Sequence, residues 1–185
     1  MEFTSTALVL IDLQHSNVAR SLAPYSSQQV VDNCSRLANT IRSKGGTVVY
    51  VRVLVNEMLQ LPADISLARD PSAPPPPPQA SELVPQAGFQ PDDIVIEKRQ
   101  WGAFHRTALD QQLRRRGIRT VIMGGIATNF GVESTARAAF DHGYALVFAH
   151  DAMSSIKKEM HEFAVQSIFP FIGQVRSTAD LLNTQ

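Results

Sequence analysis

Residues 119–151 read RTVIMGGIATNFGVESTARAAFDHGYALVFAHD, which predicts a strand, a helix and a second strand in succession. The segment 119–125 is rich in β-branched and apolar residues and ends in two glycines, as expected of a buried strand. From about Asn129 to Gly143 apolar positions recur at helical spacing, and 145–151 is apolar again. One helix face carries Val132, Ala136, Ala139 and Phe140. This order predicts two parallel strands joined by a right-handed crossover.

The same alternation covers the rest of the chain. Further strands are expected at 7–11, 47–55, 94–98 and near Val175, and further helices between 26 and 44, from about 107 to 116, around 157–168 and at 178–183. Ser26 and Gln29 have capping-box spacing, and the cations Arg114 to Arg116 suit the end of their helix. Without internal repeats, the pattern predicts a single α/β domain over 1–185. We expect a doubly wound, Rossmann-like sheet of six parallel strands with helices on both faces.

Composition excludes several classes of function. The 17 Lys and Arg residues balance 17 Asp and Glu residues, so the 185-residue chain has zero formal charge. This balance argues against nucleic acid or an anionic membrane surface as a partner. The apolar run within residues 1–13 is short and lacks a basic leader, so we expect neither a signal peptide nor a membrane span. A single cysteine, Cys34, excludes an intramolecular disulfide and favours a cytoplasmic setting.

Residues 56–90 interrupt the alternation and contain five consecutive prolines, Pro74 to Pro78. Proline has no N–H to donate, so it resists both helix and central strand. A polyproline segment can recruit a partner domain. Long irregular loops inside compact domains more often cover a site, and we expect a stiff surface loop that covers the site or lies at an oligomer interface.

Three segments place reactive groups at the predicted carboxyl edge of the sheet, where open α/β proteins bind ligands. Asp12 closes the first strand and Lys98 closes the third. The join 124–131, GGIATNFG, offers helix-start amides that can hold an anion, but neither a cysteine nor a serine in a tight turn. A carboxylate at a strand end is often only a cap, and a lone lysine there is often solvated. Together the segments predict an acid, a cation and an anion site on one edge.

These segments resemble the isochorismatase-like hydrolase superfamily, also called cysteine hydrolases. The matching stretches, in the family's order, are 8-LVLIDLQ-14, 98-KRQWGAF-104, 123-MGGIATNFGVESTARAAFDHGY-144 and 151-DAMSS-155. They span nearly the whole chain apart from 56–90. The likeness is strongest to the YecD-type hydrolases.

The resemblance implies a catalytic set of Asp, Lys and Cys, which falls on Asp12, Lys98 and Gly131. It also implies a non-proline cis peptide between Ile126 and Ala127, and an oxyanion hole formed by the amides of Ala127 and Gly131. The residues expected to bind substrate are Ile126, Ala127, Thr128, Asn129, Trp101 and Phe130.

Other candidates are weaker. Phe104 is at least as well explained by core packing, His15 and His105 are expected at the surface, and Cys34 lies on the apolar face of its helix. Some family members carry an Asp-and-His metal loop after the second strand, but residues 52–60 contain no histidine. We therefore expect no metal and no cofactor.

Amide hydrolysis by the family's usual route needs a thiolate and a covalent acyl-enzyme, which Gly131 excludes. True isochorismatases resemble this chain in having glycine there, and they cleave a vinyl ether by protonation from the Asp and addition of water. We therefore expect a small-molecule hydrolase in which Asp12 and Lys98 perform acid–base hydrolysis without a covalent intermediate. The alternative is a non-catalytic relative that binds a small anionic ligand or a protein partner. The resemblance also implies a homodimer or a higher homo-oligomer.

Overall fold

The central strand β1 (Thr6–Ile11) is buried at every position. It pairs in parallel with β2 on one side and with β4 on the other. Because alternate side chains point to opposite faces, a strand covered on both faces has to be apolar throughout. The continuous run ALVLI therefore lies at the middle of the sheet.

The computed structural model describes residues 2–65 and 72–184, and its six-stranded sheet has the order β3-β2-β1-β4-β5-β6. The other strands are β2 (Thr47–Val53), β3 (Ile94–Lys98), β4 (Thr120–Ile126), β5 (Ala145–Ser154) and β6 (Gln174–Arg176). All neighbouring strands pair in parallel. The predicted doubly wound sheet is confirmed, and its order reverses between β1 and β4, which marks the switch point where such folds bind ligands.

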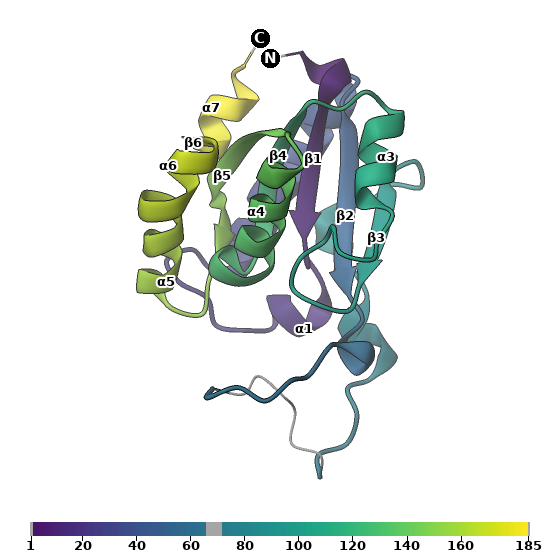
Figure 1. Ribbon diagram of the computed structural model, residues 1–185, viewed down its shortest axis with the longest axis vertical. Helices are drawn as coiled ribbons and strands as arrows, with labels where there is room; N and C mark the ends of the chain where they lie inside the picture. The colour runs from purple at the N-terminus through teal and green to yellow at the C-terminus, as the bar shows by residue number, and fades with distance from the viewer. Residues whose placement is uncertain (1, 66–71, 185) are drawn as a thin grey trace.

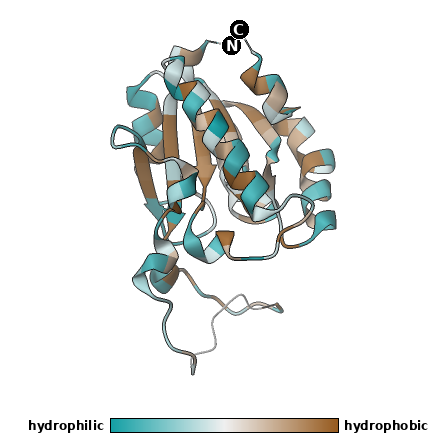
Figure 2. Ribbon diagram, turned by 180° about the vertical axis from the view of Figure 1, so that it is seen from behind, coloured by the Kyte–Doolittle hydropathy of each residue, from teal (hydrophilic) through white to brown (hydrophobic). Residues whose placement is uncertain are grey.

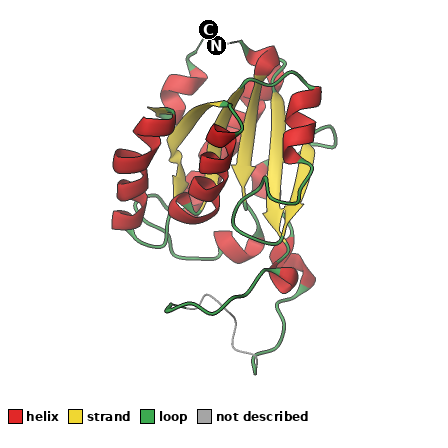
Figure 3. Ribbon diagram, viewed as in Figure 1, coloured by secondary structure: helices red, strands yellow, loops and turns green. Residues whose placement is uncertain are grey.

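Helices cover both faces of the sheet (Figures 1 and 3). The helices are α1 (His15–Val18), α2 (Ser27–Ser43), α3 (Leu109–Arg115), α4 (Glu133–Asp141), α5 (Lys158–Phe163), α6 (Phe169–Ile172) and α7 (Thr178–Leu182). Short 3₁₀ turns lie at Phe3–Ser5, Val55–Glu57, Pro78–Ser81 and Pro85–Ala87. The Ser26 side chain accepts a hydrogen bond from the Gln29 amide at 3.2 Å, as expected of the residue that caps α2.

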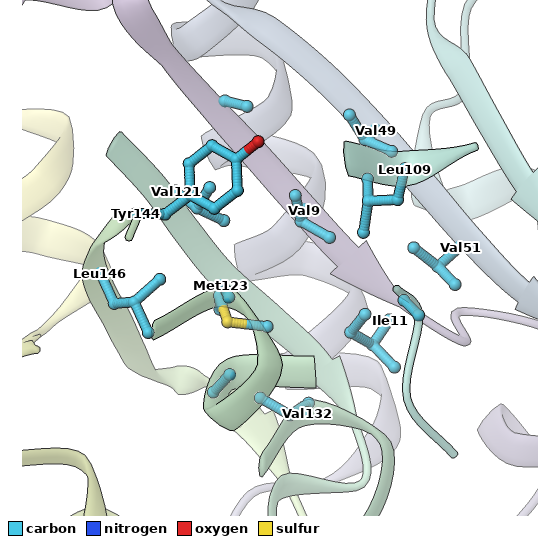
Figure 4. Close-up of a cluster of buried hydrophobic side chains, with 14 of the residues drawn as sticks. Val9, Ile11, Val49, Val51, Leu109, Val121, Met123, Val132, Tyr144 and Leu146 are labelled. Carbon is cyan, nitrogen blue, oxygen red and sulfur yellow. The ribbon is translucent and has the colours of Figure 1, made fainter. Parts of the chain in front are cut away.

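Two hydrophobic cores fill the space between the sheet and the helices. One core joins β1, β2 and β4 to residues of α3, α4 and α6, and Figure 4 shows its centre around Val9 and Met123. The other core packs α2 and α7 against the opposite face and contains Cys34. The hydropathy colouring in Figure 2 shows apolar strands enclosed by helices whose outward positions are polar.

Several predicted boundaries were wrong. β5 extends to Ser154, past a register shift against β4 between Met123 and Gly125. The helix after β4 begins as a π-helical turn, Thr128–Val132, before α4 starts. Phe140, expected on the inward face of α4, is 49% exposed because it lies about 100° around the helix from buried Ala139.

The segment predicted as one helix over 157–168 contains α5 and a π-helical turn at Ala164–Ile168, and α6 follows directly. Pro170 at the start of α6 has no N–H for the carbonyl four residues earlier, so a regular α-helix cannot continue through it. None of the helices within residues 2–65 and 72–184 is long and apolar enough to cross a membrane.

The carboxyl ends of the strands, α1 and the described residues 56–65 and 72–81 of the irregular segment lie at the same end of the molecule, opposite the two termini (Figure 1). Buried Gln14 ties the base of this loop to the sheet. Its Nε2 donates to Val53 O at 2.9 Å and to Ala80 O at 3.0 Å, and its Oε1 accepts from Val53 N at 2.8 Å. Residues 74–77, from the proline run, adopt no regular secondary structure.

Candidate active site

The backbone turns sharply at Asp12, directly after β1. Its φ of 52° lies in the left-handed region, which Asp tolerates better than most residues. The Asp12 N–H donates to Val51 O at 2.8 Å, and Asn17 Nδ2 donates to Asp12 O at 3.3 Å. These bonds on both sides of the residue hold its carboxyl group at the carboxyl edge of the sheet.

Asp12 and Lys98 form a buried ion pair. Lys98 Nζ lies 2.9 Å from Asp12 Oδ2 and donates to Trp101 O at 2.6 Å. Lys98 ends β3, and β2 separates that strand from β1, so the long lysine side chain spans the distance. The structure thus joins the two charged residues that the sequence placed at the ends of different strands.

The environment of Asp12 changes its protonation. Burial raises the pKa of Asp12 to about 6, and the Lys98 ammonium opposes this effect without cancelling it. Oδ1 of Asp12 is buried and has no hydrogen-bond partner among the described residues. A buried polar atom without a partner is costly and uncommon, so this oxygen is available to a bound molecule.

The turn after β4 is held by several hydrogen bonds. The Ile126–Ala127 peptide is cis, and Ala127 O accepts from the amides of Phe130 and Val132 at 3.1 and 3.2 Å. Asn129 Oδ1 accepts from the Ser155 hydroxyl. These contacts orient the turn toward the Asp12 carboxyl.

Thr128, in the same turn, is buried behind the chamber rather than in its wall. Its Oγ1 is hydrogen-bonded to His161 Nδ1 at 2.8 Å. Burial lowers the pKa of His161 to about 4, so the imidazole is neutral near pH 7. The expected role of Thr128 in contacting substrate is therefore not supported by its position, because its hydroxyl is already engaged by α5.

Gly131 lies directly against the ion pair. A Cβ atom built on Gly131 would lie 3.1 Å from Lys98 Nζ, 3.2 Å from Asp12 Oδ2 and 3.0 Å from Ile11 Cγ2. Any side chain at this position would therefore touch both charged groups. The Thr135 hydroxyl donates to Gly131 O at 2.7 Å and holds this turn to α4.

A chamber of about 100 Å³ opens above these groups. Of the predicted site residues, its wall contains Asp12, Trp101, Ile126, Ala127, Phe130 and Gly131. The prediction missed Asn17, Arg20, Val53, Met58, Gln100 and Ile156. Val53 could have been predicted as a lining residue, because it ends β2 at the carboxyl edge of the sheet. The other five residues lie in connecting segments, and the sequence of such segments has no periodic pattern that predicts their path.

Asn129 lines an adjoining cavity instead of the chamber. Phe104 stacks on His142, with ring centroids 4.9 Å apart, and packs against the core, while His15 and His105 are exposed. No group of three or more His, Cys, Asp or Glu side chains in the described part of the chain is arranged to hold a metal ion.

The chain is similar to known proteins along nearly its whole length. Residues 6–180 match the Isochorismatase domain. The chain is 44% identical to the isochorismatase family protein YwoC of Bacillus subtilis (strain 168), over 98% of this chain and 95% of that protein. It is 42% identical to the isochorismatase family protein YecD of Escherichia coli O157:H7, over 97% and 95%.

Among solved structures, an isochorismatase family protein from Burkholderia thailandensis superimposes with a TM-score of 0.89 at 41% identity. The match covers 98% of this chain and 97% of that one. A nicotinamidase from Staphylococcus aureus shares the fold, with a TM-score of 0.74 at 22% identity over 94% and 98%. Since the domain match and the close relatives both extend over nearly the whole chain, the protein belongs to the isochorismatase family.

Proposed function

We propose that the protein is a small-molecule hydrolase that lacks a cysteine nucleophile and uses Asp12 and Lys98 for acid–base hydrolysis. A vinyl ether or a related acid-labile bond is the substrate class that this set serves. The observation that carries the proposal is the buried Asp12–Lys98 pair beneath Gly131, with the pKa of Asp12 raised to about 6.

The position of the single thiol supports a route without a covalent intermediate. Cys34 lies in the core between α2 and the sheet, where its Sγ donates to Ala152 O at 3.2 Å. Burial raises the pKa of the Cys34 thiol above its usual range, and a protonated buried thiol is inert. Gly131, beside the ion pair, has no side chain to attack a substrate.

The chemistry then needs one proton donor and one water molecule. Protonated Asp12 gives its proton to the vinyl-ether carbon, and the resulting oxocarbenium ion is attacked by water, which returns a proton to the carboxylate. The hemiketal formed collapses to a carbonyl compound and an alcohol. Lys98 Nζ, at 2.9 Å, stabilises the carboxylate while its proton is on the substrate. A carboxyl group with a pKa near 6 suits acid work close to neutral pH.

Turnover against a panel of vinyl ethers, amides and carbamoyl compounds tests the proposal. Wild type should cleave members of the vinyl-ether group, and Asp12→Asn should lower kcat by a factor of about 10²–10⁴, the usual cost of losing a general acid. Asp92→Asn is the matched control, because Asp92 is exposed and does not belong to the chamber lining. Circular dichroism of both variants reports whether they remain folded.

The outcomes distinguish a hydrolase from a non-catalytic binding protein. If a folded Asp12→Asn protein retains full turnover, Asp12 is not the acid and the mechanism is wrong. If wild type turns over no member of the panel but a small carboxylate binds and quenches Trp101, the protein is a non-catalytic binder.

A further inference from the structure

The chamber over Asp12 is too small for a whole substrate. Its volume of about 100 Å³ holds roughly three water molecules at about 30 Å³ each. Pockets that enclose a small-molecule ligand usually measure about 300–1,000 Å³. The chamber therefore accommodates the reacting group, and the remainder of the substrate has to lie outside it.

A second cavity of about 510 Å³ continues from the chamber. The two share part of their lining, namely Met58, Gln100, Trp101, Phe130 and Ile156. We call this second cavity the antechamber. It is large enough for the part of a substrate that the chamber excludes.

Apolar side chains form most of the antechamber wall. The loop contributes Leu59, Leu61, Ala63 and Ile65, and Ile156 and Met160 lie on the body of the protein. Leu61 is 68% exposed and Ile65 is 84% exposed. An apolar group bound among these side chains would remove both its own apolar surface and theirs from water, which is favourable.

Two of the three polar residues in the antechamber lining, Gln100 and Asn129, are hydrogen-bonded within the protein, and the third, Gln60, is exposed. Gln100 Nε2 donates to the carbonyls of Gly102 and His105 at 2.9 Å each, and Asn129 Oδ1 accepts from Ser155. The charged residues of the chamber lining are Asp12 and Arg20, whereas no described residue of the antechamber lining is charged. The lining thus becomes less polar from the chamber over Asp12 to the antechamber.

We propose that the substrate is amphipathic, with a small hydrolysable group at one end and an unbranched alkyl chain at the other. The hydrolysable group enters the chamber over Asp12, and the apolar end seats between the 59–65 loop and Met160. This inference rests on the proposed function for the identity of the reacting end. The apolar end follows from the volume and lining of the antechamber alone.

The predicted binding site for an apolar chain can be tested by measuring the binding of compounds that the protein is not expected to hydrolyse. Trp101 is the only tryptophan of the chain and lines both cavities, so its fluorescence reports on binding there. The probes are the straight-chain primary amides butanamide, hexanamide and octanamide. Each methylene that becomes buried should lower Kd about three- to fourfold, so octanamide, with four more methylenes, should bind about 80- to 250-fold more tightly than butanamide.

Two matched variants test whether the alkyl chain of the probe binds in the antechamber. Leu61→Asp puts a carboxylate into the apolar wall and should weaken octanamide binding about tenfold while leaving butanamide unchanged. Phe140→Asp removes another exposed apolar side chain, on α4 and outside the antechamber lining, and should change the binding of neither probe.

A Kd independent of chain length, or an equal effect of Leu61→Asp and Phe140→Asp, would overturn the proposal. Light scattering tests whether a second copy of the chain, and not a substrate, covers the antechamber. If the chain-length dependence is absent and Leu61→Asp alone converts an oligomer to a monomer, the antechamber is a contact between copies of the chain. A chain-length dependence in a protein that turns over no substrate would leave this inference standing and contradict the proposed function.

Discussion

Replacing Asp12 with asparagine should change how the stability of the protein depends on pH. Burial raises the pKa of Asp12 from 3.8 to about 6, despite the opposing effect of Lys98. Because the pKa is higher in the folded than in the unfolded state, the stabilising contribution of this carboxyl is present below about pH 4 and is lost as the pH rises through about 6. At about 1.4 kcal/mol per pKa unit, the full change is about 3 kcal/mol.

Urea unfolding of wild type and Asp12→Asn at pH 4 and pH 7.5, followed by circular dichroism, measures this change. From pH 4 to pH 7.5, the unfolding free energy of wild type should fall by about 2 to 3 kcal/mol relative to that of the variant. The expected fall is slightly less than the full change, because Asp12 in the unfolded chain is already partly ionised at pH 4. The exposed control Asp92→Asn should follow wild type. If wild type and Asp12→Asn differ by a constant amount over this range, the folded protein does not favour the protonated carboxyl, and the acid role of Asp12 is refuted.

Further predictions concern turnover, packing, the thiol and assembly. Above about pH 6, kcat/KM should fall about tenfold per pH unit, because only protonated Asp12 donates a proton; a flat profile up to pH 8 would contradict this. Gly131→Ala would place Cβ 3.1 Å from Lys98 Nζ and should cost about 1–3 kcal/mol of stability by calorimetry, together with turnover. Iodoacetamide should leave native turnover unchanged and alkylate buried Cys34 only after unfolding, and mass spectrometry should find no acyl-enzyme. Light scattering should show a homodimer or larger assembly, in line with the 83% exposure of Phe171; monomer alone at micromolar concentration would exclude it.

Much of the fold could be predicted from hydrophobic periodicity. The four inner strands, β2, β1, β4 and β5, lie where apolar runs were found, because a strand covered on both faces needs such a run. The edge strands β3 and β6 also lie where strands were predicted, although both have exposed positions. Irregularities inside the elements were missed, including the extension of β5 past its register shift and the π-helical turn at Thr128–Val132. Periodicity does not report these, because they depend on how neighbouring strands and helices meet. Pro170 lies just beyond the helix predicted over 157–168, and its missing N–H was a readable sign that a regular α-helix does not continue past that segment.

The sequence by itself determined the alternating α/β pattern, the acid and the cation at strand ends, and the absence of a cysteine, or of a serine in a tight turn, at the join after β4. Only the tertiary structure decided that Lys98 reaches Asp12, that Asp12 is buried deeply enough to raise its pKa to about 6, and that the chamber opens into an apolar antechamber. The physical reason is that local pattern specifies which face of an element is apolar, but not which strands become neighbours or how far a side chain is removed from water. Those properties depend on contacts between residues far apart along the chain, and the reactivity of the site depends on them.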